Sequence, residues 1–288
     1  MRSRRLVPYF LLGPGLIWLV LFFVVPMYFM GRLSLESGSL QTGFEFSWEW
    51  SNYSDALTEY DQQFVRSFIY AGVATILALL IAYPLAYMIA FRGGRWKNVL
   101  LFAVVAPFFT TYLIRTLAWQ TILSDEGAVV DVMKTVGLVA DDGRVLDTAG
   151  SVIAGLTYNF LPFMILPIYA SLERIDLSLI EAAKDLYASA STTFRKVTLP
   201  LTAPGIVAGT LLTFIPAAGD YINADFLGSQ NQSMIGNVIQ SKYLIVRDYP
   251  GAAALSFVLL AIILALVLTY IKFAGSEALM GDEAEDTA

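Results

Sequence analysis

Long blocks of apolar residues alternate with short polar segments along almost the whole chain. The hydrocarbon core of a bilayer is about 30 Å thick, so a helix rising about 1.5 Å per residue needs about 20 apolar residues to cross it. Six segments satisfy this requirement: 9–30, 68–91, 99–123, 151–172, 204–224 and 252–273. The pattern predicts an all-α integral membrane protein with six transmembrane helices, of which the third is interrupted by Arg115.

The first apolar segment also has the charged start of a signal peptide, because Arg2, Arg4 and Arg5 precede it. A cleaved signal has a shorter apolar region and small residues at its end, whereas this segment is long and ends around Met27 and Met30. We therefore interpret it as a retained helix.

The distribution of Lys and Arg predicts the orientation in the membrane. With the N-terminus inside, eleven of these residues fall in cytoplasmic segments and six in external segments, with Arg115 inside a span. Cytoplasmic segments carry the excess of positive residues in membrane proteins, so both termini are expected in the cytoplasm. The predicted organisation is a cytoplasmic N-terminus (1–8), a membrane domain (9–273) and an acidic, disordered cytoplasmic tail (274–288).

Composition narrows the chemistry. Hydrophobic residues make up 57% of the chain and charged residues 15%, and there is no Cys and no His. These absences exclude thiol nucleophiles, disulfides and Ser-His-Asp triads, and we expect no metal or cofactor in this chain. A net charge of −6 also argues against non-specific binding of nucleic acid.

Charged groups inside predicted spans indicate candidate functional positions, because an ionisable group in hydrocarbon is costly unless it faces a cavity or a partner. Asp220 and Asp225, with Tyr221 and Asn223, are candidates for lining the route of a cationic solute. Arg115 either extends to the surface, pairs with an acid, or contacts an anionic ligand. The external segments are rich in acids, which form either a solvated surface or an attractive field for cations.

The longest cytoplasmic segment, 173–203, is predicted to form two short amphipathic helices. Ser178 and Glu181 have the spacing of a capping box that opens the first helix, and the second runs over about 191–198 until Pro200 stops it. Such helices either lie on the lipid surface or form a docking platform for another protein.

The sequence EAAKDLYASASTTFRKVTLP, residues 181–200, resembles the EAA loop of permease subunits of bacterial ABC importers. The positions that match the family pattern are Glu181, Ala182, Ala183, Leu199 and Pro200. The resemblance implies a type I importer permease fold whose loop fits a cleft in an ATPase subunit, with Asp185, Leu186 and Tyr187 as contacts. Tyr187 occupies the position of a family glycine, where a positive φ would cost a tyrosine roughly 1–2 kcal/mol unless the turn differs.

The resemblance extends over further segments, including PFFTTYLIRTLAWQTILSDEG, LPFMILPIYASLERID, LPLTAPGIVAG and IGNVIQSKYLIVRDYPGAAALS. Together these segments are similar to permease subunits of spermidine/putrescine importers. The similarity implies a bacterial plasma-membrane complex with a second permease, two ATPase subunits and an external substrate-binding protein. The chain has no GxxxxGK[ST] motif, so ATP and Mg are expected in the partner subunits, whose closure would drive alternating access.

Three alternatives stay open. Related importers carry thiosulfate, sulfate, iron or opines, and an anion importer should present basic residues such as Arg115 to its ligand. A self-sufficient secondary transporter would have to rely on Asp220, Asp225 and Arg115, and we find no internal repeat in the sequence. A membrane-embedded enzyme would need clustered acid–base residues, which the predicted spans lack.

Overall fold

The computed structural model describes residues 7–274 and contains two compact units. The first comprises residues 1–61 and 238–261, and the second comprises 62–237 and 262–288. Most of the predicted cytoplasmic ends, 1–8 and 274–288, therefore lies outside the described residues.

The first unit begins with one continuous helical stretch, in which a single turn of π-helix separates two α-helices. An antiparallel hairpin follows, with Glu36 opposite Phe46 and Ser39 opposite Gly43; the hydropathy pattern did not predict it. The elements are α1 Val7–Leu19, η2 Val20–Val24, α2 Val25–Leu33, β1 Glu36–Ser39, β2 Gly43–Phe46, α3 Ser51–Glu59, η7 Lys242–Val246 and the first half of α15 Tyr249–Ala274.

The second unit is built from helices only, within the residues described. Its elements are α4 Asp61–Arg92, η3 Gly94–Trp96, α5 Lys97–Val105, η4 Ala106–Phe109, α6 Tyr112–Ile122, α7 Ala128–Thr135, α8 Ala149–Glu173, α9 Leu177–Asp185, α10 Ala190–Thr193, η5 Phe194–Thr198, α11 Leu199–Leu201, α12 Ala203–Ala218, α13 Ile222–Leu227, η6 Gln230–Gln232 and α14 Ile235–Ser241. The second half of α15 completes it.

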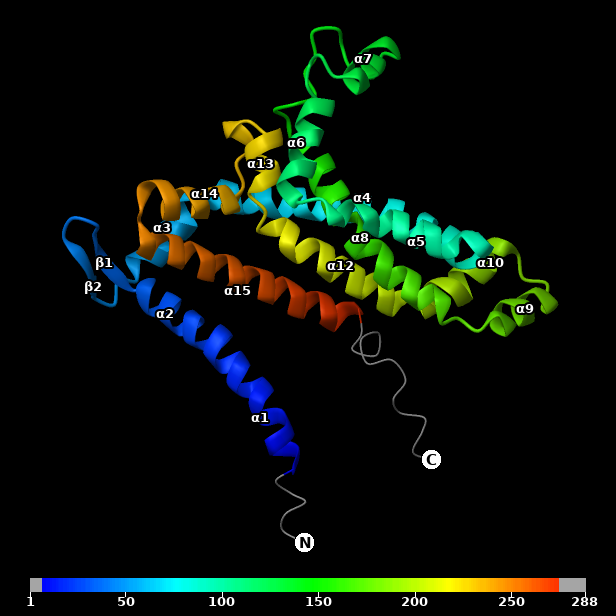
Figure 1. Ribbon diagram of the computed structural model, residues 1–288, viewed down its shortest axis with the longest axis horizontal. Coiled ribbons are helices and arrows are strands. Elements are labelled where there is room, and N and C mark those ends of the chain that lie inside the picture. The colour runs from blue at the N-terminus through cyan, green and yellow to red at the C-terminus, as the bar shows by residue number, and fades with distance from the viewer. Residues whose placement is uncertain (1–6, 275–288) are drawn as a thin grey trace. The chain divides into compact units, whose positions relative to one another are not determined.

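Small residues allow the helices of the second unit to pack closely. Helices α8 and α12 lie side by side (Figure 1), and a Cβ atom at Gly209 of α12 would approach the Met164 carbonyl of α8 to 3.0 Å. Helix α4 contributes buried alanines at helical spacing to two apolar clusters shared with α8, namely Ala71, Ala74, Ala78, Ala82 and Ala86. Small interfaces of this kind are typical of membrane helices, where tight van der Waals packing replaces the hydrophobic effect.

Within residues 7–274, four helical segments are long and apolar enough to span a membrane without interruption, and there are six if two bent pairs each count as one span. These agree with the six predicted positions, but two predictions of a simple helix were wrong. The third segment breaks by 95° between 94–109 and α6. Thr110 and Thr111 are extended there, following Pro107, so the helical hydrogen bonds stop and restart in a new direction.

The fifth segment also differs from its prediction of 204–224. Helix α12 ends at Ala218, Gly219 follows it, and Asp220 lies in the connection to α13. At its other end, α12 meets residues 190–201 at a bend of 62°, where Pro204 occupies the first turn.

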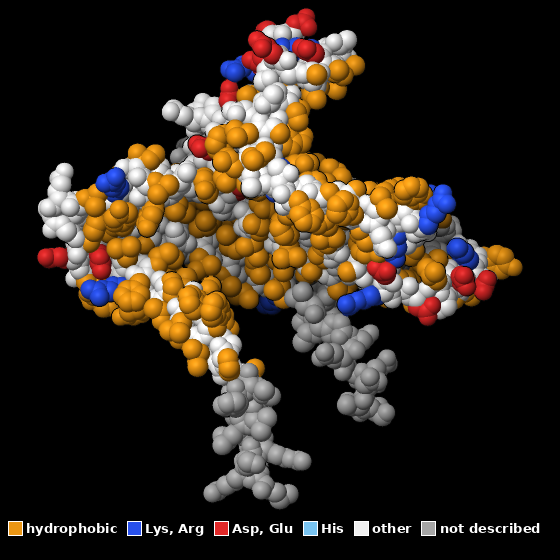
Figure 2. All heavy atoms as spheres, viewed as in Figure 1, with side chains coloured by type: hydrophobic (Ala, Val, Ile, Leu, Met, Phe, Trp, Pro, Cys, Tyr) orange, Lys and Arg blue, Asp and Glu red, His pale blue; other side chains and the backbone are white. Residues whose placement is uncertain are grey.

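Charged side chains gather at two regions of the second unit, around α7 and around α9–α10, and apolar side chains cover the surface over α5 between them (Figure 2). The exposed apolar side chains of α5 and η4 include Val99, Phe102 and Phe109. An apolar band bounded by charged ends is the surface expected of a unit that crosses a bilayer.

Candidate functional site

The first candidate site is the pair of short helices at one charged end of the second unit, α9 and α10. Helix α9 starts at Leu177 because the Asp176 carboxylate accepts a 2.9 Å hydrogen bond from the Ser178 backbone N–H. The predicted capping box of Ser178 with Glu181 was therefore wrong, since the cap lies two residues earlier. The same hydrogen bond holds the pKa of Asp176 below its ordinary value.

The turn after α9 has the geometry that the family glycine would provide. Tyr187 has a φ of +56°, in the left-handed region. The Tyr187 N–H bonds the Lys184 carbonyl at 2.8 Å and the Ala188 N–H bonds the Ala183 carbonyl at 3.0 Å. These two bonds define a Schellman motif. Of the two alternatives left open by the sequence, Tyr187 thus adopts the left-handed turn and bears its conformational cost.

The second helix is longer than predicted. Ser189 caps α10 by accepting from the Thr192 N–H, and helical backbone continues through η5 and α11. Pro200 lies in the first turn of α11, where its missing N–H is harmless, so the expectation that Pro200 stops this helix was wrong. The chain bends after Thr202, whose hydroxyl is 2.9 Å from that of Tyr83 in α4.

The α9–α10 turn presents apolar side chains to the exterior. Leu186 is 82% exposed and Tyr187 is 98% exposed. Glu181, Ala182 and Asp185 are also exposed, while Ala183 is half-buried. Exposed apolar groups ringed by charges on a rigid turn are a typical docking surface.

The second candidate site is a buried polar network that joins α6, α8 and α13. The Tyr112 hydroxyl donates to the Asp220 carboxylate at 2.6 Å and accepts from the Asn223 side-chain amide at 2.5 Å. The Asn159 amide then donates to the Asn223 side-chain oxygen at 3.0 Å and contacts the Thr116 hydroxyl at 3.4 Å. The network connects residues more than 100 positions apart in the sequence.

Hydrogen bonds within the protein engage both oxygens of Asp220. Besides Tyr112, the carboxylate accepts from the Asn223 backbone N–H at 2.8 Å and from its side-chain amide at 3.2 Å. Asp220 and Asn223 are buried, whereas Tyr221 and Asp225 are exposed. Of the five predicted pathway residues, the structure thus joins Asp220 and Asn223 in one network and leaves Tyr221 and Asp225 exposed. The fifth is Arg115.

Arg115 lies beside this network and is only 9% exposed. Its guanidinium forms no hydrogen bond or ion pair with any residue that the structure describes, and its Nε atom is buried. The guanidinium carbon instead lies 4.6 Å from the ring centre of Phe108 and 5.6 Å from that of Tyr112. Aromatic faces attract a cation in this way because their π-electron density is negative.

Arg115 also lines a cavity of about 310 Å³ whose walls come from α4, α5, η4 and α8. The other lining residues are Leu85, Ile89, Leu100, Ala103, Val104, Pro107, Tyr158, Leu161, Pro162 and Ile165. The cavity is therefore apolar apart from the guanidinium and the Tyr158 hydroxyl, and has the size of a small-ligand pocket.

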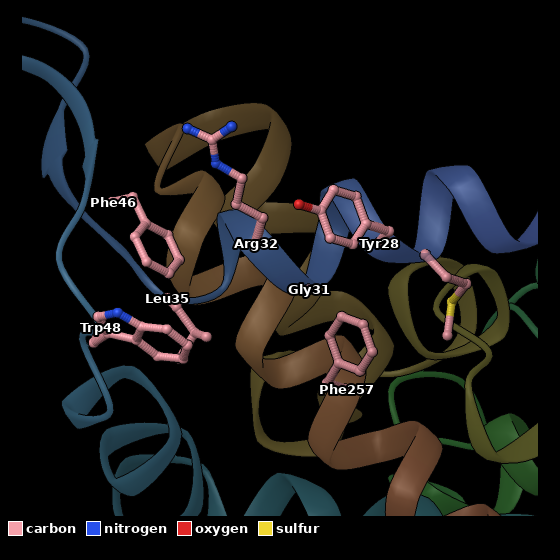
Figure 3. Close-up of a pocket in the computed structure, with 8 residues that line it drawn as sticks. Tyr28, Gly31, Arg32, Leu35, Phe46, Trp48 and Phe257 are labelled. Atoms are coloured by element: carbon pink, nitrogen blue, oxygen red, sulfur yellow. The ribbon is translucent and has the colours of Figure 1, made fainter.

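A larger cavity of about 660 Å³ lies in the first unit, between α2, the hairpin and α15. Figure 3 shows Phe46 of β2 and the nearby Trp48 on one side, Phe257 of α15 on another, and Arg32 of α2 near its edge. The 18-residue apolar window of the helix that ends in α2 has no buried residue, so its apolar side chains are available for contacts.

The sequence missed part of the second site. Tyr112, Thr116 and Asn159 are single polar residues in apolar segments, and hydroxyl and amide groups are common in membrane helices. Only their proximity in the folded structure distinguishes these three residues from other polar residues in the spans. Among the residues described, no three acidic side chains come together as a metal site.

The second unit combines bent membrane spans with a protruding pair of short helices, which is the architecture of an importer permease. A chain of a bacterial alginate ABC transporter, in complex with an alginate pentasaccharide-bound periplasmic protein, has this fold. It aligns with a TM-score of 0.67 over 96% of both chains, at 20% identity. This chain belongs to the family described as binding-protein-dependent transport system inner membrane component, which matches residues 5–273.

Curated relatives agree with this assignment. The spermidine/putrescine transport system permease protein PotB of Haemophilus influenzae is 37% identical over 88% of this chain and 90% of its own length. The protein of the same name from Escherichia coli K12 is 35% identical over 88% of this chain and 92% of its own length. The family resemblance noted in residues 181–200 is thus confirmed.

Proposed function

We propose that this chain is the pore-forming permease subunit of an ATP-driven importer that moves polyamines such as spermidine and putrescine into the cytoplasm. The observation that carries the substrate class is the 37% identity to a spermidine/putrescine permease over 88% of the chain. The exposed Asp225 and the acids around α7 suit a substrate with several positive charges.

The α9–α10 turn is the proposed docking point of the ATPase subunits. Leu186 and Tyr187 insert as an apolar contact, and Glu181 and Asp185 supply the surrounding charges. ATP and Mg are then bound by the partners, and closure of the ATPases pulls on α9 and α10. Because helical backbone runs on from α10 to α11, this motion reaches α12 at its 62° bend.

Two further partners complete the proposed complex. A substrate-binding protein delivers the polyamine on the external side; the family description and the alginate transporter's periplasmic protein support this assignment. A second permease covers the unburied span that ends in α2 and the neighbouring cavity of Figure 3. Alternating access then operates between the two permeases.

The proposed orientation places α9 and α10 in the cytoplasm and α7 outside. Residues 1–8 and 274–288 are then cytoplasmic segments that flank the membrane domain, 9–273. The loop 173–203 is the cytoplasmic coupling loop, and the complex occupies the bacterial inner membrane. The excess of Lys and Arg in the predicted cytoplasmic segments supports this orientation.

The substrate is tested by expressing the tagged chain with its partners, identifying what co-purifies in stoichiometric amounts, and measuring polyamine uptake in proteoliposomes. We expect Asp225→Asn to lower uptake several-fold while assembly is unchanged, because the exposed carboxylate acts on the passing cation. Asp220→Asn is the matched control: it disturbs a buried network and should lower the stability of the complex. Wild-type complex that takes up no polyamine would overturn the substrate assignment.

Coupling is tested by Glu181→Lys. We expect this reversal of charge on α9 to leave ATP hydrolysis in place and to lower polyamine uptake at least tenfold, because the ATPases no longer move the permease. The ratio of transported polyamine to hydrolysed ATP is the measurement. An unchanged ratio would remove α9 from the coupling path.

A second candidate substrate is an oxyanion such as sulfate or thiosulfate, which the unpaired Arg115 favours. Uptake assays in the same proteoliposomes distinguish the two substrates, because labelled polyamine and labelled oxyanion are supplied in separate experiments. Uptake of the oxyanion, without uptake of polyamine, would reassign the chain to that class of importer.

A further inference from the structure

We propose that Arg115 is a tethered competitor for the substrate: its guanidinium occupies an aromatic cage that binds an ammonium group of the polyamine during transport. This inference rests on the proposed polyamine function and assigns a specific site to it. It starts from the guanidinium of Arg115, a buried cation without a polar partner among the described residues.

The cage consists of aromatic rings from η4, α6 and α8. Phe108 and Tyr112 face the guanidinium at 4.6 Å and 5.6 Å. Phe163 packs against Phe108 at 5.2 Å between ring centres, and Phe160 lies 6.1 Å from Tyr112 and 6.3 Å from Phe163. Ring faces attract ammonium as well as guanidinium groups, so the same faces can accept an alkylammonium group.

The cage is fixed in place by the polar network. Tyr112 is held through its hydroxyl by Asp220 and Asn223, at 2.6 Å and 2.5 Å. These hydrogen bonds orient its ring toward Arg115, and they occupy the Asp220 carboxylate. Asp220 is therefore a positioning residue for the cage and leaves the guanidinium without a salt bridge.

The adjoining 310 Å³ cavity has room for the Arg115 side chain once it is displaced from the cage. Its walls are apolar except for Tyr158, so the side chain gains no stronger partner by moving there. The resting arrangement therefore keeps the guanidinium on the rings until another cation displaces it. Two cations cannot share the cage, because like charges at this distance repel strongly in a medium of low dielectric constant.

This competition has a functional purpose. A permease that binds its substrate weakly at rest releases it readily, and the positive charge of the resting guanidinium repels small inorganic cations from the empty route. Delivery by a binding protein, at high local concentration, supplies the cation that displaces Arg115.

The test uses the complete transporter in detergent, without binding protein and without ATP. Binding of labelled spermidine is measured by equilibrium dialysis. We expect Arg115→Gln to bind spermidine at least tenfold more tightly than wild type, because the cage is vacated. Arg115→Lys, which keeps the charge, should bind as weakly as wild type. In the double variant with Phe108→Leu, the gain should disappear.

Arg115→Met provides a second test, because it fills the volume of the side chain without charge and so protects assembly if the glutamine variant is unstable. No gain in either variant, with normal ATP-driven polyamine uptake by wild type, would overturn the inference and leave the proposed function standing. A gain that persists after Phe108→Leu would also overturn it, because the rings would then not be the binding site. Absence of uptake by wild type would count against the proposed function alone.

Discussion

At the residue scale, Tyr187 is a position where the backbone carries a clear conformational cost. Tyr187 takes the left-handed conformation that glycine adopts without cost, at a φ of +56°. The two Schellman hydrogen bonds to Lys184 and Ala183 hold it there. A side chain at this position therefore costs conformational energy and in return places a large, exposed ring at the tip of α9.

Replacing this tyrosine should reveal the cost. We expect Tyr187→Gly to stabilise the α9 turn by roughly 0.5–1 kcal/mol, the relief of left-handed strain less the added flexibility of glycine. Amide hydrogen exchange at Ala188 and Leu186 in the assembled complex measures the free energy of local opening.

Leu186→Gly is the matched control, because the neighbouring leucine is also exposed but has a φ of −83°. It should destabilise the turn by roughly 0.5–1 kcal/mol. Faster exchange in both glycine variants would mean that the ring of Tyr187 stabilises the turn by contacts that outweigh the strain.

At the scale of elements, helix α13 is held against α8 by close approach as well as by hydrogen bonds. A Cβ atom at Gly155 of α8 would come within 2.4 Å of Leu227 and 2.6 Å of the Asn223 side-chain oxygen. The same amide group of Asn223 accepts from Asn159 at 3.0 Å. Packing and polar contacts at this junction therefore depend on each other.

Gly155→Ala should break this junction. We expect a loss of about 1–3 kcal/mol in the stability of the complex, because either Leu227 or the Asn223 side chain must move. Gly72→Ala is the control: nothing lies within 4 Å of a Cβ atom there, and alanine favours the α4 helix. Thermal unfolding of the two purified variants is the comparison, and equal midpoints would show that the junction adapts freely.

The sequence predicted where helices occur better than how they are joined. Apolar length located all six spans, because burial in lipid depends on composition along the chain. The apolar pattern could not reveal the 95° break at Thr110 and Thr111, because the hydropathy of a residue does not depend on the direction of its helix. The Tyr112–Asp220 contact was likewise out of reach, because it depends on how α6 and α13 pack.

At the scale of the whole molecule, the two charged regions of the second unit define how it would lie in a bilayer. The acid-rich segment around α7 and the α9–α10 turn are expected on opposite sides. The absence of cysteine in the chain makes this arrangement easy to test, since any introduced thiol is unique.

Two single-cysteine variants serve this purpose, Leu138→Cys after α7 and Leu186→Cys after α9. Their leucines are 74% and 82% exposed, so both thiols should be reactive. In right-side-out vesicles whose permease carries no ATPase subunits, a membrane-impermeant maleimide should label position 138 and spare position 186, with both labelled after detergent is added. The reverse pattern would invert the orientation.

The unburied first span has a consequence for how cells make this protein. The helix that ends in α2 has no buried side chain in its apolar window, so its packing depends on what surrounds it in the membrane. If the proposed second permease covers this span, synthesis of this chain alone would yield an incompletely packed subunit exposed to membrane proteases. The number of working transporters would then be set by whichever permease is made in the smaller amount, and the two genes would have to be expressed in balance.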